Sequence, residues 1–168
     1  MKNKSLAIVV MGVSGCGKTT IGQALARRLG GSFYDGDDFH PLENVRKMAA
    51  GIPLDDADRA PWLARLNLLL HEHVERAEGV VVACSALKWR YREQLRTGNE
   101  GLRFVYLQGS FEVIWQRMAS RPQHYMLPSM LQSQFDTLEP PGPDEALTLS
   151  VTEEVTTLLN LIEQNLLS

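Results

Sequence analysis

The sequence predicts an α/β domain of three layers, in which helices cover both faces of a five-stranded parallel sheet. Short apolar runs recur along its 168 residues and alternate with stretches of helical spacing. The runs are continuous, and this is typical of strands that are buried on both faces. A glycine-rich loop joins the first run to the first helical stretch. The chain is therefore expected to form a single domain over residues 1–168, with no internal repeat or linker.

Each element is predicted from its own local signals. The expected strands are 6–11, 32–34, 79–84, 102–107 and 146–150. The expected helices are 18–29, 61–78, one that includes 88–92, one that follows Ser110, 129–135 and a last helix that follows Ser150 and includes 155–166. Pro61 is expected at the first helical position, and Ser129 with Gln132 and Ser150 with Glu153 are expected to form capping boxes. The polar stretch 38–60 is expected to be an irregular substrate flap, and 121–128 a short lid.

The loop after the first strand carries the strongest functional signal. It fits the pattern GxxxxGK[ST] at every fixed position, between an apolar strand and a helix as that motif requires. Its glycines let successive main-chain amides point at phosphate oxygens, and the start of the helix adds partial positive charge. Lys18 can then reach the β- and γ-phosphates, and the Thr19 hydroxyl can bind Mg²⁺. The predicted nucleotide-binding residues are Gly12, Val13, Ser14, Gly15, Cys16, Gly17, Lys18, Thr19 and Thr20.

Acidic residues follow the second predicted strand. Asp35 and Asp37 come where that strand ends, and the carboxyl ends of parallel strands are where α/β domains bind ligands. If the strand continues through Gly36, both side chains leave from one face. The Asp-Gly pair also fits a simple polar turn. Beside a phosphate loop we favour the functional reading, with Asp37 as the base for an acceptor hydroxyl and Asp35 on a water bound to Mg²⁺.

Basic residues could bind anionic groups at three places. Arg46 and Arg59 lie in the flap. Lys88 and Arg92 share a predicted helix face, where they bind an anion or form ordinary surface charge. Arg117 and Arg121 end a predicted helix before Pro122, so they either bring positive charge onto a transferring phosphate or only offset the helix dipole.

Composition and charge exclude several other classes. A net charge of −3 and a pI near 5.8 give no broad basic surface, so nucleic acid is not expected as a partner. The apolar run that enters the phosphate loop is too short to cross a membrane, and no membrane association is expected. With only Cys16 and Cys84, we expect reduced thiols and a cytoplasmic location. An Asn-Lys-x-Asp stretch typical of regulatory GTPases is not found.

A combination of further motifs resembles bacterial gluconate kinase over roughly residues 8–140. Besides the phosphate loop, the chain contains DGDDFHP at 35–41, GIPL at 51–54, PWL at 61–63, CSALKWRYR at 84–92, SQF at 133–135 and LEP at 138–140. The resemblance implies a fold shared with shikimate kinase, ATP-dependent phosphorylation of D-gluconate to 6-phosphogluconate, ATP and Mg²⁺ as cofactors, and a homodimer.

The resemblance also implies roles for individual residues. Asp37, His40, Arg59, Lys88, Arg92 and His124 would face the sugar acid, as would Arg46 and Gln134, with Lys18, Asp37, Arg117 and Arg121 as catalytic residues. Spacing alone does not choose gluconate over another small hydroxy acid. Two rival functions stay open: a related kinase of shikimate or nucleotides, and a nucleotide-dependent sensor without an acceptor.

Overall fold

The structure, a computed structural model, describes residues 6–121 and 127–167 of the chain. Its centre is a five-stranded parallel sheet in the order β2-β3-β1-β4-β5. The strands are β1 (Ala7–Met11), β2 (Ser32–Asp35), β3 (Val80–Ala83), β4 (Arg103–Gln108) and β5 (Leu147–Ser150). All five predicted strands are confirmed. Because β1 is central, the loop that follows it emerges from the middle of the carboxyl edge of the sheet.

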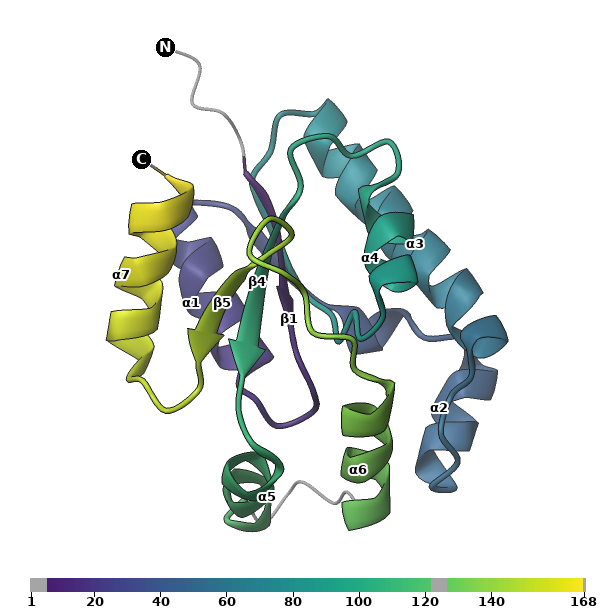
Figure 1. Cartoon of the computed structure of the whole chain (residues 1–168). Helices are drawn as coiled ribbons and strands as arrows, with labels where there is room; N and C mark the ends of the chain where they lie inside the picture. The colour runs from purple at the N-terminus through teal and green to yellow at the C-terminus, as the bar shows by residue number, and fades with distance from the viewer. Residues whose placement is uncertain (1–5, 122–126, 168) are drawn as a thin grey trace.

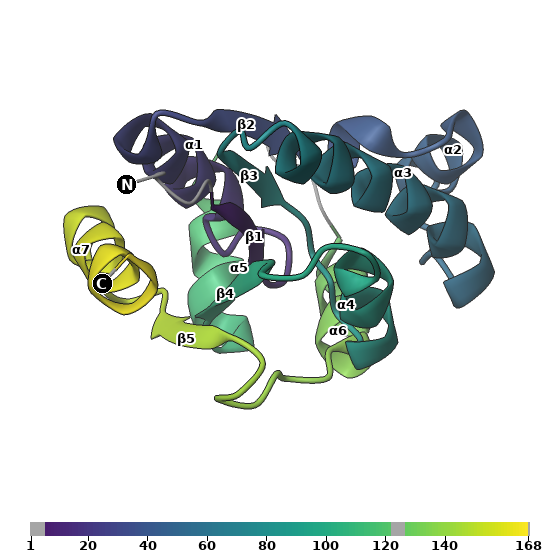
Figure 2. The same ribbon diagram turned by 90° about the horizontal axis from the view of Figure 1, so that it is seen from above.

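Helices lie on both faces of the sheet and beyond the carboxyl ends of its strands. They are α1 (Lys18–Leu29), α2 (Leu42–Ala49), α3 (Asp56–Glu75), α4 (Trp89–Arg96), α5 (Phe111–Ala119), α6 (Pro128–Thr137) and α7 (Val155–Leu166), with a 3₁₀ turn, η1 (Gly36–Phe39). Helices α1 and α7 cover one face of the sheet, and α3 and α4 cover the other (Figure 2). Helices α2, α5 and α6 lie beyond the carboxyl ends of the strands (Figure 1). Within the described residues, no helix has the length and apolarity needed to span a membrane.

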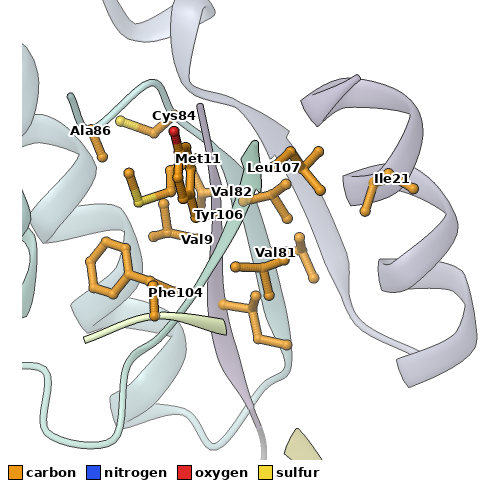
Figure 3. Close-up of a cluster of buried hydrophobic side chains, with 14 of the residues drawn as sticks. Val9, Met11, Ile21, Val81, Val82, Cys84, Ala86, Phe104, Tyr106 and Leu107 are labelled. Atoms are coloured by element: carbon orange, nitrogen blue, oxygen red, sulfur yellow. The ribbon is translucent and has the colours of Figure 1, made fainter. Parts of the chain in front are cut away.

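The sheet is buried because its strands are apolar on both faces. Val9 and Met11 of β1 and Val82 of β3 are fully buried, and Phe104 of β4 is 2% exposed. Figure 3 shows these side chains packed together, with Ile21 directed from α1 toward the sheet. Burying each such side chain contributes about 1.5–3 kcal/mol. This packing fixes the strand ends, and therefore the loops that leave them, on a rigid platform.

The predicted irregular flap contains regular structure. Helix α2 occupies 42–49, and α3 begins at Asp56, so Pro61 lies inside α3 and not at its first position. A capping box starts α3. The side chain of Asp55 accepts from the main-chain N–H of Asp58, and the side chain of Asp58 accepts from the main-chain N–H of Asp55. Lys47 of α2 pairs with Asp58 at 2.9 Å and ties the short helix to this start.

Two predicted capping boxes are also wrong. Helix α6 begins at Pro128, with Leu127 as its N-cap, because proline suits a first helical position. Helix α7 begins after Glu154 without a side-chain cap. Ser150 belongs to β5, and its hydroxyl is 2.7 Å from that of Thr152.

Candidate active site

The phosphate loop has the backbone geometry that its glycines predict. Gly17 adopts φ 101° and ψ 17° and forms the N-cap of α1, a conformation that favours glycine. At Gly12 (φ 144°) an added Cβ would lie 2.7 Å from Sγ of Cys16 and 2.9 Å from the carbonyl oxygen of Leu107. The loop therefore excludes a side chain at this position. Nζ of Lys18 donates to the carbonyls of Gly12 (3.0 Å) and Val13 (2.9 Å), so the lysine is folded over its own loop.

The acids after β2 are arranged by a turn. The strand ends at Asp35 and the chain enters η1 at Gly36, so the two carboxylates do not leave from one strand face as expected. Instead, Oδ1 of Asp35 accepts from the main-chain N–H of Asp37 at 3.0 Å. This contact caps η1 and directs the side chain of Asp37 toward the phosphate loop, where it lines a cavity together with Lys18.

That cavity, the acceptor cavity, has a volume of about 400 Å³ and is bounded by the phosphate loop, η1, α2, α3 and α6. Its polar lining residues are Ser14, Lys18, Asp37, His40, Arg59, Ser85, Ser133 and Gln134. The structure thus brings together five of the predicted substrate or catalytic residues from four separate segments. Met48, Leu54, Trp62 and Met130 contribute apolar walls. A volume of this size suits a small molecule with several hydroxyl groups.

Burial and charge set the protonation of two residues in the acceptor cavity. Crowding by protein atoms raises the pKa of Asp37 above 3.8, Lys18 acts in the opposite sense, and Asp35 and Asp38 add to the rise. Water still reaches this side chain, which is 75% exposed. Burial, followed by the positive charge of Arg59, lowers the pKa of His40 to about 4. His40 is therefore neutral.

Arg59 is held in the acceptor cavity by a chain of contacts. Its Nη1 donates to the hydroxyl oxygen of Tyr91 at 3.0 Å, and that hydroxyl donates to Oδ1 of Asp56. Asp56 also pairs with Lys88 and Arg90, each at 2.9 Å. None of these contacts pairs the guanidinium of Arg59 with a carboxylate. The guanidinium therefore remains available to the carboxylate of a ligand.

Three predicted substrate residues lie outside the acceptor cavity. Arg92 is 1% exposed; it pairs with Glu145 and donates to the carbonyls of Ala86 (2.8 Å) and Glu139 (2.9 Å). Lys88 is paired with Asp56, and Arg46 lies on the exposed side of α2. The structure does not bring these three to the cavity, because local acidic partners or the direction of the helix face place them elsewhere. His124 lies outside the described residues.

Gln134 reaches the acceptor cavity in an unexpected way. Its Oε1 accepts from the main-chain N–H of Ser14 at 2.7 Å, and its Nε2 donates to Oγ of Ser14 at 2.9 Å. Helix α6 is therefore fastened directly to the phosphate loop through both ends of one amide. Sequence spacing places these residues 120 positions apart and gives no signal of the contact.

A second cavity, the nucleotide-side cavity, lies on the other side of the phosphate loop. It has a volume of about 470 Å³ and is lined by Cys16, Gly17, Thr20, Ile21, Arg117, Ser120, Arg121, Leu158 and the 151–155 segment. Both predicted lid arginines therefore face this cavity and not the acceptor cavity. Arg117 also donates to the carbonyl of Val151. The phosphate loop lines both cavities, with Ser14 and Lys18 on the acceptor cavity and Cys16 and Gly17 on the nucleotide-side cavity.

Sequence reasoning missed three residues that shape the acceptor cavity. The Trp62 ring stacks on His40 with 4.1 Å between centroids, and its Nε1 donates to the carbonyl of Gly36 at 2.7 Å. Asn44 is 3% exposed and contacts His40, and Tyr91 orients Arg59. Trp62 and Tyr91 fit the core spacing of their helices, which hides their polar contacts. No sequence pattern marks Asn44, because its burial and its contacts arise only in the folded structure.

Comparison with known proteins gives the family. The family model for shikimate kinase matches residues 14–138. A gluconokinase of Gluconobacter oxydans is 51% identical over 138 residues, which cover 82% of this chain and 78% of the relative. The chain belongs to the gluconokinase family.

Further relatives of the gluconokinase family agree with this assignment. The thermoresistant gluconokinase of Escherichia coli is 46% identical and the match covers 85% of this chain and 82% of the relative. The crystal structure of a gluconokinase from Sinorhizobium meliloti superimposes with a TM-score of 0.85 at 45% identity, covering 94% of this chain and 89% of that one. The predicted fold class is thereby confirmed, as is the resemblance drawn from the motifs.

Proposed function

We propose that the protein transfers the γ-phosphate of ATP to D-gluconate and forms 6-phospho-D-gluconate. The observation that carries the proposal is the phosphate loop between two cavities, with Asp37 and Arg59 in the acceptor cavity. The guanidinium of Arg59 matches the carboxylate of a sugar acid. The hydroxyl chain of gluconate suits the remaining donors and acceptors of that cavity.

The acceptor hydroxyl attacks the γ-phosphorus on the side opposite ADP. The new P–O bond forms as the bond to the β–γ bridging oxygen breaks, and the hydroxyl proton passes to the Asp37 carboxylate. Lys18, released from the carbonyls of its loop, balances charge on the β- and γ-phosphate oxygens. We propose that Arg117 and Arg121, which line the nucleotide-side cavity, bind the nucleotide.

The chain offers oxygen ligands that suit Mg²⁺. The Thr19 hydroxyl is exposed at the start of α1, and the Asp35 carboxylate stands at the end of β2. We propose that Thr19 binds the ion directly and that Asp35 holds one of its water ligands. Bound Mg²⁺ would neutralise charge on the phosphates.

An acceptor screen with purified protein tests the proposal. Release of ADP is followed with ATP, Mg²⁺ and, in turn, gluconate, shikimate and nucleoside monophosphates. We expect turnover with gluconate and little with the other two classes. Turnover with shikimate or a nucleotide alone would assign a related kinase, and ATP binding without turnover of any acceptor would assign a sensor.

We also propose a homodimer in the cytoplasm. The family resemblance supports the dimer, and exposed apolar residues such as Leu42 (62%) and Trp89 (55%) offer surface that a second copy could bury. Cys16 and Cys84 are both buried and unpaired, which suits a reducing compartment. Light scattering of the purified protein measures the oligomeric state directly.

A further inference from the structure

The buried amide of Asn44 determines how the His40 ring is protonated. Nδ2 of Asn44 lies 2.8 Å from the carbonyl oxygen of Asp58 and 3.2 Å from Nδ1 of His40. A carbonyl oxygen only accepts hydrogen bonds, so the atom facing Asp58 is the amide nitrogen and not the amide oxygen. Its second proton is then directed at His40. Nδ1 of His40 therefore accepts a hydrogen bond.

The proton of the neutral ring must be on the other nitrogen. His40 is neutral because its side chain is 4% exposed and close to the positive charge of Arg59. A neutral imidazole carries one N–H, and with Nδ1 accepting, that N–H is at Nε2. Stacking on Trp62, with an interplanar angle of 18°, fixes the plane of the ring. Nε2 points toward Asp37, 3.9 Å from its Oδ1.

We propose that Asn44 is a positioning residue for the phosphoryl acceptor, because it holds His40 in the tautomer whose Nε2–H donates into the acceptor cavity. The cavity then presents a fixed donor, His40, next to a fixed acceptor, Asp37. One hydroxyl of a polyol chain satisfies both, since it donates its proton to Asp37 and accepts from His40. An analogue without that hydroxyl leaves the N–H of the buried His40 ring without a partner, so it should bind about tenfold more weakly. The inference rests on the proposed function for the identity of the acceptor.

The tautomer can be measured directly in the wild-type protein. Long-range ¹H–¹⁵N correlation spectra at neutral pH distinguish the two ring nitrogens, and loss of the signal in His40→Gln assigns it. We expect a protonated Nε2 and an unprotonated Nδ1. A protonated Nδ1, or a mixture of both tautomers, overturns the inference. This readout does not depend on turnover, so it stands even if gluconate is not the acceptor.

Two variants of His40 test the role of its Nε2–H. The amide nitrogen of glutamine reaches the place of Nε2, whereas that of asparagine reaches only the place of Nδ1. Both changes should raise KM for gluconate, and His40→Asn should raise it about tenfold more than His40→Gln, the scale of one lost hydrogen bond to a polar ligand. Equal effects, or the reverse order, contradict the proposed donor.

The variant Asn44→Asp tests the positioning role itself. A carboxylate beside Nδ1 accepts and does not donate, so the ring proton should move to Nδ1, and KM for gluconate should rise about tenfold or more. Asn99→Asp is the matched control, because Asn99 is also buried (1% exposed) and its amide donates to the carbonyl of Leu95 at 2.9 Å. It should lower stability and leave the His40 spectrum unchanged. An unchanged tautomer in Asn44→Asp refutes the role of Asn44. If that variant does not fold, the wild-type spectrum decides.

Discussion

At the scale of single residues, Asp37 is the group on which the proposed chemistry depends most. Replacing it with Asn removes the proton acceptor and keeps the shape of the side chain. We expect kcat to fall at least about a hundredfold, with a smaller change in KM for ATP, as for a lost acid–base contribution. Steady-state kinetics measure both constants. Near-normal kcat in Asp37→Asn removes Asp37 as the base.

The same residue predicts a pH dependence. Because crowding by protein atoms raises the pKa of Asp37 above 3.8, the reactive carboxylate is lost at a higher pH than for an exposed aspartate. The rate with saturating substrates should therefore fall as the pH drops through this raised value. The acid limb of the pH–rate profile reports it.

Lys18→Ala removes the charge that lowers the pKa of Asp37 and should move the acid limb of the pH–rate profile to higher pH. It should also lower kcat about a hundredfold.

His40 links pH to the stability of the fold. Its pKa falls from 6.5 in the unfolded chain to about 4 in the folded protein. Between these values the unfolded state binds more protons than the folded state. The contribution of His40 to the free energy of unfolding is therefore fully present above pH 6.5 and decreases as the pH falls toward 4. The loss from this residue is on the order of 3 kcal/mol. Urea unfolding at several pH values should show this slope, and His40→Gln should lack that part of it.

The sequence predicts the structural roles of some residues and not those of others. Gly12 and Gly17 were predictable, because the shape of the phosphate loop depends on the backbone freedom of a few adjacent residues. Arg92 was not. Its charge is bound by Glu145, which is 53 positions away, and only the packing of two distant segments decides whether the pair forms. Asn44 was missed because its contact with the carbonyl of Asp58, which lies in another helix, forms only when α2 packs against the start of α3.

At the scale of elements, the pair of Arg92 and Glu145 joins α4 to the loop before β5. Hydrogen bonds and charge from Arg92 and Arg96 outweigh the effect of burial and lower the pKa of Glu145, so the pair is ionised at neutral pH. Glu145→Ala leaves the charge of Arg92 buried without its acidic partner and should cost about 3–5 kcal/mol of unfolding free energy. Denaturant unfolding measures this loss.

The kinetics of the same variant distinguish a structural arginine from a substrate-binding one. If Arg92 only fastens α4, folded Glu145→Ala protein keeps the wild-type KM for gluconate. A large change in KM with little loss of stability would instead return Arg92 to the substrate site. Asp144→Ala, one position earlier in the same exposed loop, serves as the control and should change neither quantity.

Boundaries of elements were predicted where the signal is local and missed where it is tertiary. The predicted end of α1 at residue 29 is confirmed, and Gly30 follows it in the left-handed conformation that glycine favours. Helix α2 was read as irregular because its stretch of sequence is polar, whereas its support comes from Asp58 of another helix. The predicted start of α3 at Pro61 was wrong. The capping box at Asp55 precedes this proline, and the helix runs through it.

At the scale of the whole molecule, the five strands and their parallel direction were predictable, because continuous apolar runs joined by helices allow few other arrangements. The order of the strands was not part of that prediction. The order decides function, since it places β1 at the centre and β2 beside β3. The loop after β1 and the acids after β2 then share one edge of the sheet, on either side of the end of β3.

This placement divides ligand binding between two cavities that meet at one loop. Of these two cavities as the described residues form them, Arg59 lines the acceptor cavity and Arg121 the nucleotide-side cavity. A ligand that binds the folded state at a hundred times its Kd adds about 2.7 kcal/mol of stability, which for a chain of this length raises Tm by about 5–10 °C. We expect ADP and gluconate each to raise Tm of the wild-type protein on this scale.

Two variants should separate these effects. Arg59→Ala should lose most of the Tm shift with gluconate and keep the shift with ADP, since its cavity faces away from the nucleotide. Arg121→Ala should show the opposite pattern at the same ligand concentrations. Thermal melts with each ligand alone, in all three proteins, give the complete comparison. Loss of both shifts in either folded variant would mean that the two ligands share one space, and the division of the site at the phosphate loop would then be wrong.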